Sequence, residues 1–243
     1  FSTDLGPAVT SSDIVFIAVG TPSRDDGQAD LSQVIQVTEE LVKHVDRYKV
    51  IAIKSTVPVG TVELVRGILA REKLEGEDFD IVANPEFLRE GKGLFDFFYP
   101  DRIVIGACSP RAQAVLRDLY EPIVQGRVSW QDEGQSMTRP TPVPVVETDP
   151  ASAQMIKYAS NAFLATRISF INEVASLCER VGADITEVVR GMGYDPRIGD
   201  SYLQPGLGFG GPCLEKDLRA LIRIGEDGDS QPPLFTAVLE RNE

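Results

Sequence analysis

Histidine is nearly absent from this chain of 243 residues, whose only example is His44. That residue lies in an amphipathic stretch typical of a helix surface, so histidine-rich metal sites are excluded and no metal is expected. A Ser-His-Asp triad is equally disfavoured, and any acid–base catalysis falls to Lys, Asp, Glu or water. Cysteine is scarce too. Cys108, Cys178 and Cys213 are odd in number and far apart, which argues against a disulfide framework and for a reducing compartment.

Basic residues are also in short supply, with 24 Lys and Arg against 37 Asp and Glu and a net charge of −13. No basic stripe is present, so a nucleic-acid partner is not expected. No apolar run approaches the ~20 residues that span a bilayer, and no signal peptide is found at the start. We therefore expect a cytoplasmic protein without membrane contact. Hydrophobic residues make up 42%, enough for a folded core in one large or two modest domains.

Strand and helix patterns alternate in the first half of the chain. Apolar runs typical of buried parallel strands occupy 13–19, 49–54, 80–83 and 102–106, and helical spacing occupies 31–47, 60–73 and 111–120. The alternation predicts an α/β fold with a doubly wound, Rossmann-like parallel sheet. Such sheets bind ligands at the carboxyl ends of their strands, where polar or turn residues stand at 20–22, 55–56 and 84–86. Turns are polar in any fold, so these segments are candidates only.

The second half is predicted to be helical, after a long surface loop at 126–144. Asp149 and Pro150 are typical of an N-cap and the first helical position, and neither Gly nor Pro interrupts 151–181. This predicts one helix of ~45 Å, followed by shorter helices at 184–190, 217–224 and 234–242.

The chain is accordingly divided into a Rossmann-like domain at 1–147 and a helical domain at 148–243. The long helix is too apolar on one side to be covered by a small domain. We therefore expect it to form the core of a homodimer.

A glycine-rich run at 208–211 leads to Cys213, with Lys216 and Asp217 three and four residues later. Glycines let a ligand approach the backbone closely, and a helix after Cys213 would place all three side chains on one face. A helix start and a neighbouring cation favour the thiolate, as in an activated nucleophile. The alternative is a small buried structural cysteine.

Two further pairs share the four-residue spacing, Glu86 with Glu90 and Lys157 with Asn161. Each pair alone is a weak indication, since charged pairs at this spacing also decorate solvated helices. Apolar residues flank Lys157 and Asn161, so this pair is expected to face a cleft or an interface.

Five ordered segments of the chain resemble one enzyme family; they are 54–60, 84–91, 157–161, 172–173 and 208–217. They resemble the nucleotide-sugar 6-dehydrogenases of the UDP-glucose/GDP-mannose dehydrogenase family, and 100–106 and 192–199 are most similar to its bacterial UDP-glucose branch. The resemblance implies an enzyme that oxidises the C6 alcohol of UDP-glucose to UDP-glucuronate with two NAD⁺ in succession. GDP-mannose and UDP-N-acetylmannosamine are the alternative substrates, because part of the base and sugar contacts lies outside this chain.

The resemblance also implies roles for individual residues. Cys213 matches the nucleophile that holds the sugar as a thiohemiacetal and then as a thioester. Lys157 and Asn161 match the groups that stabilise oxyanions. Asp217 matches the carboxylate that takes the alcohol proton together with a water.

Two more catalytic positions follow from it. Glu86 matches the residue linked to thioester hydrolysis, and Thr56 matches the threonine near the nicotinamide and the reacting sugar. Expected NAD contacts are Thr21, Thr56, Glu90 and Lys216. Expected nucleotide-sugar contacts are Glu86, Phe87, Leu88, Arg89, Lys157, Asn161, Tyr202, Gly208 and Gly210.

The sequence departs from the family pattern beside the cysteine. Pro212 stands where Ser, Ala or Tyr is usual and removes an N–H, and Glu215 replaces a proline and adds a charge that raises a thiol pKa. The Gly-x-Gly-x-x-Gly loop and the family's C-terminal domain are not in the chain. We therefore expect a fragment of a dehydrogenase that is inactive by itself. The alternative is a paralogue retained as a non-catalytic dimerisation module.

Overall fold

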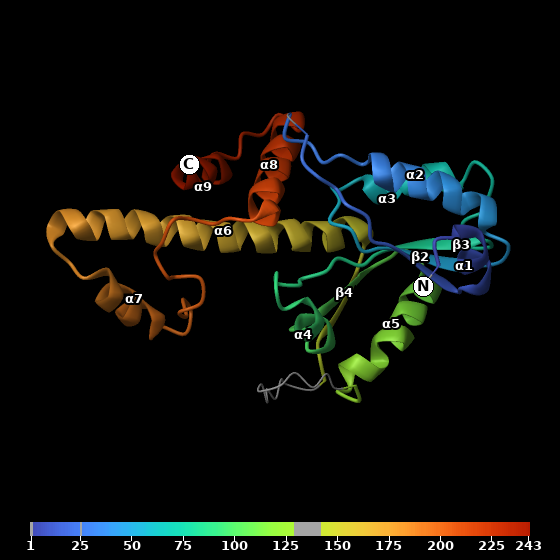
Figure 1. Cartoon of the computed structure of the whole chain (residues 1–243), viewed down its shortest axis with the longest axis horizontal. Coiled ribbons are helices and arrows are strands. Elements are labelled where there is room, and N and C mark those ends of the chain that lie inside the picture. Colours follow the sequence, from blue (N-terminus) through green and yellow to red (C-terminus); the bar gives the residue numbers. More distant parts are fainter. Residues whose placement is uncertain (1, 25, 129–141) are drawn as a thin grey trace. The chain divides into compact units, whose positions relative to one another are not determined.

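The computed structural model describes residues 2–24, 26–128 and 142–243, and the chain forms two compact units (Figure 1). The first unit comprises Phe1–Thr21 and Asp30–Lys157, and the second comprises Pro22–Ala29 and Tyr158–Glu243. The domain division between 147 and 148 stays a prediction. Of the predicted loop at 126–144, residues 129–141 lie outside the described part of the chain.

A five-stranded sheet forms the centre of the first unit, in the order β1-β2-β3-β4-β5. Its strands are β1 (Ile14–Ile17), β2 (Lys49–Ile53), β3 (Phe79–Ala83), β4 (Ile103–Gly106) and β5 (Val145–Thr148). The first three are parallel, as their continuous apolar runs predict. β4 is the exception, because it meets β3 antiparallel through the pair Ala83 and Gly106, while β5 runs parallel to β4. The apolar runs did not predict β5, whose four residues are all partly or fully exposed.

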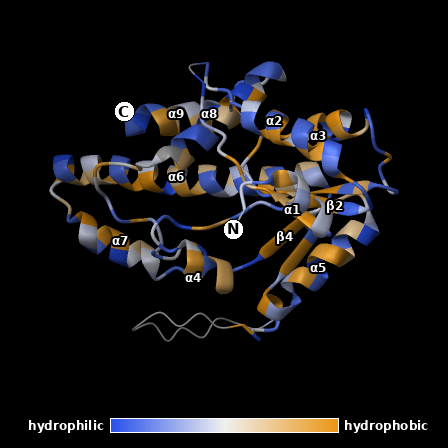
Figure 2. Cartoon of the chain, turned by 45° about the vertical axis from the view of Figure 1, so that its right-hand side comes forward, coloured by the Kyte–Doolittle hydropathy of each residue, from blue (hydrophilic) through white to orange (hydrophobic). Residues whose placement is uncertain are grey.

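Helices cover both faces of this sheet, and each face has its own hydrophobic core. One core takes side chains from α1 (Leu5–Ser11), α2 (Ser32–Leu41) and α3 (Thr61–Leu69), and 3-10 helix η1 (Val42–His44) extends α2. The opposite core is built on α5 (Pro110–Val124), whose Leu116 and Tyr120 are buried. Figure 2 shows β4 as hydrophobic along its length, whereas α5 carries both hydrophobic and hydrophilic residues. This two-faced packing is the predicted doubly wound arrangement. The sequence patterns missed the short helices α1 and α4 (Gly93–Phe98).

Close packing at the end of β4 requires a glycine. A Cβ at Gly106 would lie 2.4 Å from Ala153 Cβ and 2.8 Å from the carbonyl oxygen of Asp149. The bare backbone lets helix α6 (Pro150–Val181) begin directly against the sheet. Asp149 caps this helix as predicted, accepting hydrogen bonds from the backbone N–H and the hydroxyl of Ser152 at 2.9 and 2.6 Å.

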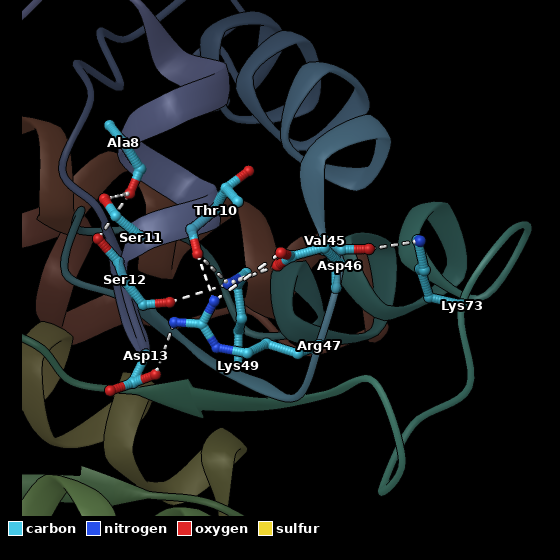
Figure 3. Close-up of polar contacts among 10 residues, drawn as sticks. All are labelled: Ala8, Thr10, Ser11, Ser12, Asp13, Val45, Asp46, Arg47, Lys49 and Lys73. Carbon is cyan, nitrogen blue, oxygen red and sulfur yellow. Dashed lines mark hydrogen bonds and ion pairs between the residues drawn. The ribbon is translucent and has the colours of Figure 1, made fainter.

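A polar cluster joins the end of α1 to the start of β2 (Figure 3). The buried Lys49 ammonium lies 2.9 Å from the Ser12 carbonyl oxygen and 3.0 Å from Asp46 Oδ1, and Arg47 donates to the carbonyl of Thr10. Carbonyls at the end of a helix have no partner within it, so these cations satisfy them. The hydrogen bond from Lys49 is the main cause that holds the pKa of Asp46 below its usual value. The cluster ties α1 to β2 at the amino-terminal edge of the sheet.

The second unit is helical, as predicted. It contains most of α6, a helix of 32 residues, together with α7 (Ile185–Gly193), α8 (Pro212–Asp227) and α9 (Pro233–Asn242). Its core includes Tyr158, Leu218 and Val238. α8 begins at Pro212, five residues before the predicted start at 217, because proline is accepted in a first helical turn. Cys213 therefore lies inside this helix. No helix in the described ranges is long and apolar enough to cross a membrane.

Candidate active site

The carboxyl ends of β1 and β2 hold two predicted site residues next to each other. Thr21 Oγ1 donates to the backbone oxygen of Thr56 at 2.8 Å. Ser55 Oγ donates to the Val19 carbonyl at 2.7 Å, which fastens the same two segments together. Parallel sheets bind ligands at this edge, so Thr21 and Thr56 are placed where a ligand would approach.

The segment after β3 carries Glu86, but it is not a helix. Residues 84–89 form neither helix nor strand, so Glu86 and Glu90 do not share a helix face as their spacing suggested. Proline at 85 disfavours a helical conformation at the preceding residue, and the Glu86 carboxylate accepts a hydrogen bond from the Leu88 N–H at 2.5 Å. Arg89 binds the buried Asp96 through its guanidinium at 2.6 Å and through its backbone N–H at 2.8 Å. These hydrogen bonds hold the loop in a defined conformation.

Glu86 forms an ion pair with Lys157 inside the first unit. Lys157 Nζ donates to Glu86 Oε1 at 3.0 Å, and the two side chains are only 7% and 26% exposed. The Phe87 ring centroid lies 5.5 Å from the same ammonium group. The pair joins residues 71 positions apart in the sequence, and it is the first of two polar clusters that contain predicted site residues.

Three polar residues absent from the predicted site lie close to this ion pair. Lys54 Nζ is 3.2 Å from Asn84 Oδ1 and 3.4 Å from the Tyr120 hydroxyl, which itself donates to Asn84 Oδ1 at 2.6 Å. Burial lowers the pKa of Lys54 to about 8 and raises that of Tyr120 to about 12. Glu86 raises the pKa of Lys54 and Lys157 lowers it. The sequence offered one signal for this group, since Asn84 lies in the polar segment 84–86 at the end of a predicted strand.

The second cluster lies in the second unit, around a buried carboxylate. Asp217 is 1% exposed, and its Oδ2 accepts from Asn161 Nδ2 at 2.6 Å while its Oδ1 pairs with Lys216 Nζ at 2.7 Å. Burial, followed by the charge of Asp217, raises the pKa of Tyr158. The Tyr158 hydroxyl has no hydrogen-bond partner among the described residues. Three predicted site residues therefore lie together here, along with Tyr158, which the sequence analysis did not predict.

Cys213 lies in the first turn of α8, four residues before Asp217, and its side chain is exposed. The N–H groups of a first helical turn are unpaired within the helix and give that end a partial positive charge. Glu215, the unusual acidic residue beside it, pairs with Arg219 at 2.9 Å. That ion pair offsets part of the negative charge which the sequence places near the thiol.

The glycine loop before α8 is anchored to α9. Phe209 N donates to Asn242 Oδ1 at 2.7 Å, and a Cβ at Gly208 would lie 2.4 Å from that oxygen. Gly208 also has a φ of +111°, which side chains rarely adopt, so glycine is required there. A Cβ at Gly210 would meet open space, and Tyr202 is exposed with a φ of 60°. These two positions are left accessible for a ligand.

The groups described above comprise one thiol, the carboxylates of Glu86 and Asp217, the amides of Asn84 and Asn161, and the ammonium groups of Lys54, Lys157 and Lys216. No group of three His, Cys, Asp or Glu side chains in this part is arranged to hold a metal ion. In the first unit, the buried ammonium of Lys157 can stabilise a negative oxygen. In the second unit, the amide of Asn161 can do the same, and Asp217 can accept a proton.

Comparisons with known proteins identify the family to which the chain belongs. Residues 1–124 match the NAD binding domain of the UDP-glucose/GDP-mannose dehydrogenase family, and residues 151–243 match the central domain of the same family. The UDP-glucose 6-dehydrogenase YwqF of Bacillus subtilis (strain 168) is 43% identical over 242 residues, covering 100% of this chain and 51% of its own length.

Two solved structures are also similar. A UDP-glucose dehydrogenase from the archaeon Pyrobaculum islandicum has a TM-score of 0.88 at 42% identity, covering 100% of this chain and 52% of its own. A GDP-mannose dehydrogenase from Pseudomonas aeruginosa has a TM-score of 0.71 at 30% identity, covering 99% and 53%. The chain thus spans about half the length of the curated relatives it matches. Because models of one family match residues 1–124 and 151–243, the chain belongs to the UDP-glucose/GDP-mannose dehydrogenase family.

Proposed function

We propose that the protein containing this chain oxidises the C6 alcohol of UDP-glucose to a carboxylate, with NAD⁺ as the hydride acceptor in both steps. The observation that carries the proposal is the second cluster. An exposed thiol at a helix start precedes, by one turn, a buried carboxylate held by an amide and an ammonium group. An alcohol-to-acid oxidation needs a base for the alcohol and a nucleophile for the aldehyde, and this cluster offers both.

The residues at the sheet edge fit a nicotinamide cofactor. Thr21 and Thr56 present hydroxyl and backbone groups at the ends of two parallel strands, where dinucleotides bind in such sheets. We infer that Lys216 and Glu90 add contacts to it. When bound, NAD⁺ would accept one hydride in each oxidation.

In the first oxidation, Asp217 takes the C6 hydroxyl proton through a water as the C6 hydrogen leaves as hydride. Lys157 and Asn161 donate to the oxygen while its negative charge develops. The Asp217 side chain is held in place for this role because both of its oxygens already accept hydrogen bonds.

In the second oxidation, the Cys213 sulfur forms a bond to the aldehyde carbon, and the oxygen takes a proton to give a thiohemiacetal. Loss of a second hydride and of that proton leaves a thioester. Water, assisted by Glu86, then adds to the carbonyl, and breaking of the C–S bond releases the acid and the free thiol.

Two alternatives are less well supported. GDP-mannose or UDP-N-acetylmannosamine as substrate is disfavoured because the UDP-glucose dehydrogenase neighbour is 42% identical and the GDP-mannose dehydrogenase neighbour 30%. A non-catalytic dimerisation module is disfavoured because the Glu86–Lys157 pair and the Asp217 cluster are both intact.

We further propose that the second unit pairs with a second copy of itself through α6. Apolar side chains recur along one face of this helix and are exposed, with Phe163 at 60%, Phe170 at 50% and Leu177 at 54%. Their seven-residue spacing is that of a helix–helix seam. Sedimentation of the full-length protein should give a dimer or a multiple of it, and a monomer at micromolar concentration would contradict the pairing.

We also infer a cytoplasmic location, because three free cysteines are typical of a protein in a reducing compartment.

Replacement of Cys213 by Ser tests the proposed chemistry. The variant keeps a hydroxyl but loses the good nucleophile and leaving group, so turnover should stop after the first oxidation or at the ester. Mass spectrometry of the variant with UDP-glucose and NAD⁺ should show aldehyde or a covalent sugar adduct. Uronate formation at the native rate would mean that Cys213 is structural.

A further inference from the structure

Lys54 is a charged residue of the first unit that neither the predicted site nor the proposed steps use. It stands directly after β2, at the edge where Thr56 also lies. Its side chain is partly buried, and in the described ranges it makes no ion pair with a carboxylate. Its ammonium group instead contacts an amide oxygen and a phenol, which are neutral. Burying a charge in this way costs stability, so its presence calls for a reason.

The contacts of Lys54 reach the loop that carries Glu86. Asn84 Oδ1 accepts from both Lys54 and Tyr120, while Asn84 Nδ2 donates to the Val104 carbonyl at 2.7 Å. These bonds fix the amide of a residue that is 1% exposed and stands two positions before Glu86. The orientation of the Glu86 loop therefore depends on a group of bonds that includes Lys54.

The charges of the first cluster also depend on Lys54. Glu86 and Lys157 pair at 3.0 Å and are together neutral. Lys54 interacts electrostatically with both residues. Glu86 favours the protonated form of Lys54, and Lys157 disfavours it. With one carboxylate and two ammonium groups, the cluster carries a net charge of +1 only while Lys54 is protonated.

We propose that Lys54 is a positioning residue of this site: it gives the cluster of Glu86, Lys157 and Lys54 its net positive charge and, through Asn84, fixes the loop that carries Glu86. The catalytic consequence rests on the proposed function, because a net positive cluster stabilises an oxygen that becomes negative. The titratable groups facing Lys54 are Glu86, Lys157 and Tyr120. Since burial lowers the pKa of Lys54 to about 8, the cluster loses its net charge in mildly alkaline solution.

The charge can be measured without turnover. Lysines of the full-length protein are dimethylated with ¹³C, and the Lys54 signal is assigned by its absence in Lys54→Arg. The expected titration midpoint is near pH 8, against a higher midpoint for Lys43, whose pKa its hydrogen bond with Glu40 raises. Glu86→Gln should lower the Lys54 midpoint further and Lys157→Met should raise it. A Lys54 midpoint above 10 that neither substitution moves would overturn the proposal.

Kinetics then test the consequence. Lys54→Met should lower kcat for NADH formation from UDP-glucose at least about tenfold, less than the roughly 10²–10³-fold cost of removing a direct oxyanion donor. Lys54→Arg should retain activity and extend it above pH 8, where native activity falls. The exposed Lys43→Met is the matched control and should behave as native. Native kcat and pH profile in Lys54→Met would refute the role. If no nucleotide sugar is oxidised while the coupled titration holds, the proposed function fails and the Lys54 assignment stands.

Discussion

Replacing Lys54 by Met should make the pH dependence of stability less steep, by an amount that follows from its burial. The lysine pKa is lowered from 10.5 to about 8 in the folded protein, a gap of roughly 2.5 units. At about 1.4 kcal/mol per unit, this corresponds to about 3 kcal/mol between the two protonation states. Between pH 8 and 10.5 the unfolded chain binds a proton that the folded chain does not. The free energy of unfolding should therefore rise with pH in this window by about 3 kcal/mol from Lys54 alone.

Urea unfolding of native protein and Lys54→Met at half-unit steps from pH 7 to 10 measures this contribution. The difference in unfolding free energy should change by about 2.5 kcal/mol across the series, with the variant relatively more stable at pH 7. Lys43→Met is the control, because Lys43 is exposed. A difference that stays constant from pH 7 to 10 would refute the burial of a charged Lys54.

Gly106→Ala should destabilise the protein by about 1–3 kcal/mol or more in urea unfolding, since its Cβ would lie 2.4 Å from Ala153 Cβ; an unchanged midpoint would contradict the packing. Asp46→Asn should make the free energy of unfolding fall less steeply as the pH is lowered into the acid range. The lowered pKa of Asp46, due mainly to Lys49, contributes stability above its unfolded value that is lost as pH falls through the folded one. Native acid unfolding in this variant would contradict that. Asp217→Asn should lower kcat by about 10²-fold or more in an NADH assay with little change in far-UV circular dichroism, and near-native kcat would exclude Asp217 as the base.

The parts of the fold that follow from local patterns were predicted from sequence. Continuous apolar runs predicted the three parallel strands, and two of these, β2 and β3, are buried at all five residues. The absence of Gly and Pro from 151–181 predicted α6, and Asp149 caps it as the sequence indicated. The elements that were missed, α1, α4 and β5, are too short to show a period.

The sequence proposed residues for the site but did not indicate which of them contact one another. The four-residue spacing suggested Glu86 with Glu90, Lys157 with Asn161, and Cys213 with Asp217. In the structure, the Glu86 carboxylate binds Lys157, 71 residues away, and the Asp217 carboxylate binds Asn161, 56 residues away. Such pairings are set by tertiary packing, which helical spacing does not report.

Lys54 was missed as a site residue for a related reason. A lysine at the end of a strand reads as an ordinary surface charge, and only its burial beside Asn84 and Tyr120 gives it a lowered pKa. Desolvation is a property of the folded environment. No pattern in the sequence itself distinguishes Lys54 from an exposed lysine such as Lys43.

The most direct test of the proposed function is the stoichiometry of NADH formed per UDP-glucose by the full-length protein. A limiting amount of UDP-glucose is incubated with excess NAD⁺, the absorbance of NADH is followed to completion, and the sugar product is identified by mass spectrometry. Two NADH per UDP-glucose, with UDP-glucuronate as the product and no free aldehyde, is the predicted result. One NADH per sugar with release of the aldehyde, or no NADH from any nucleotide sugar, would contradict it.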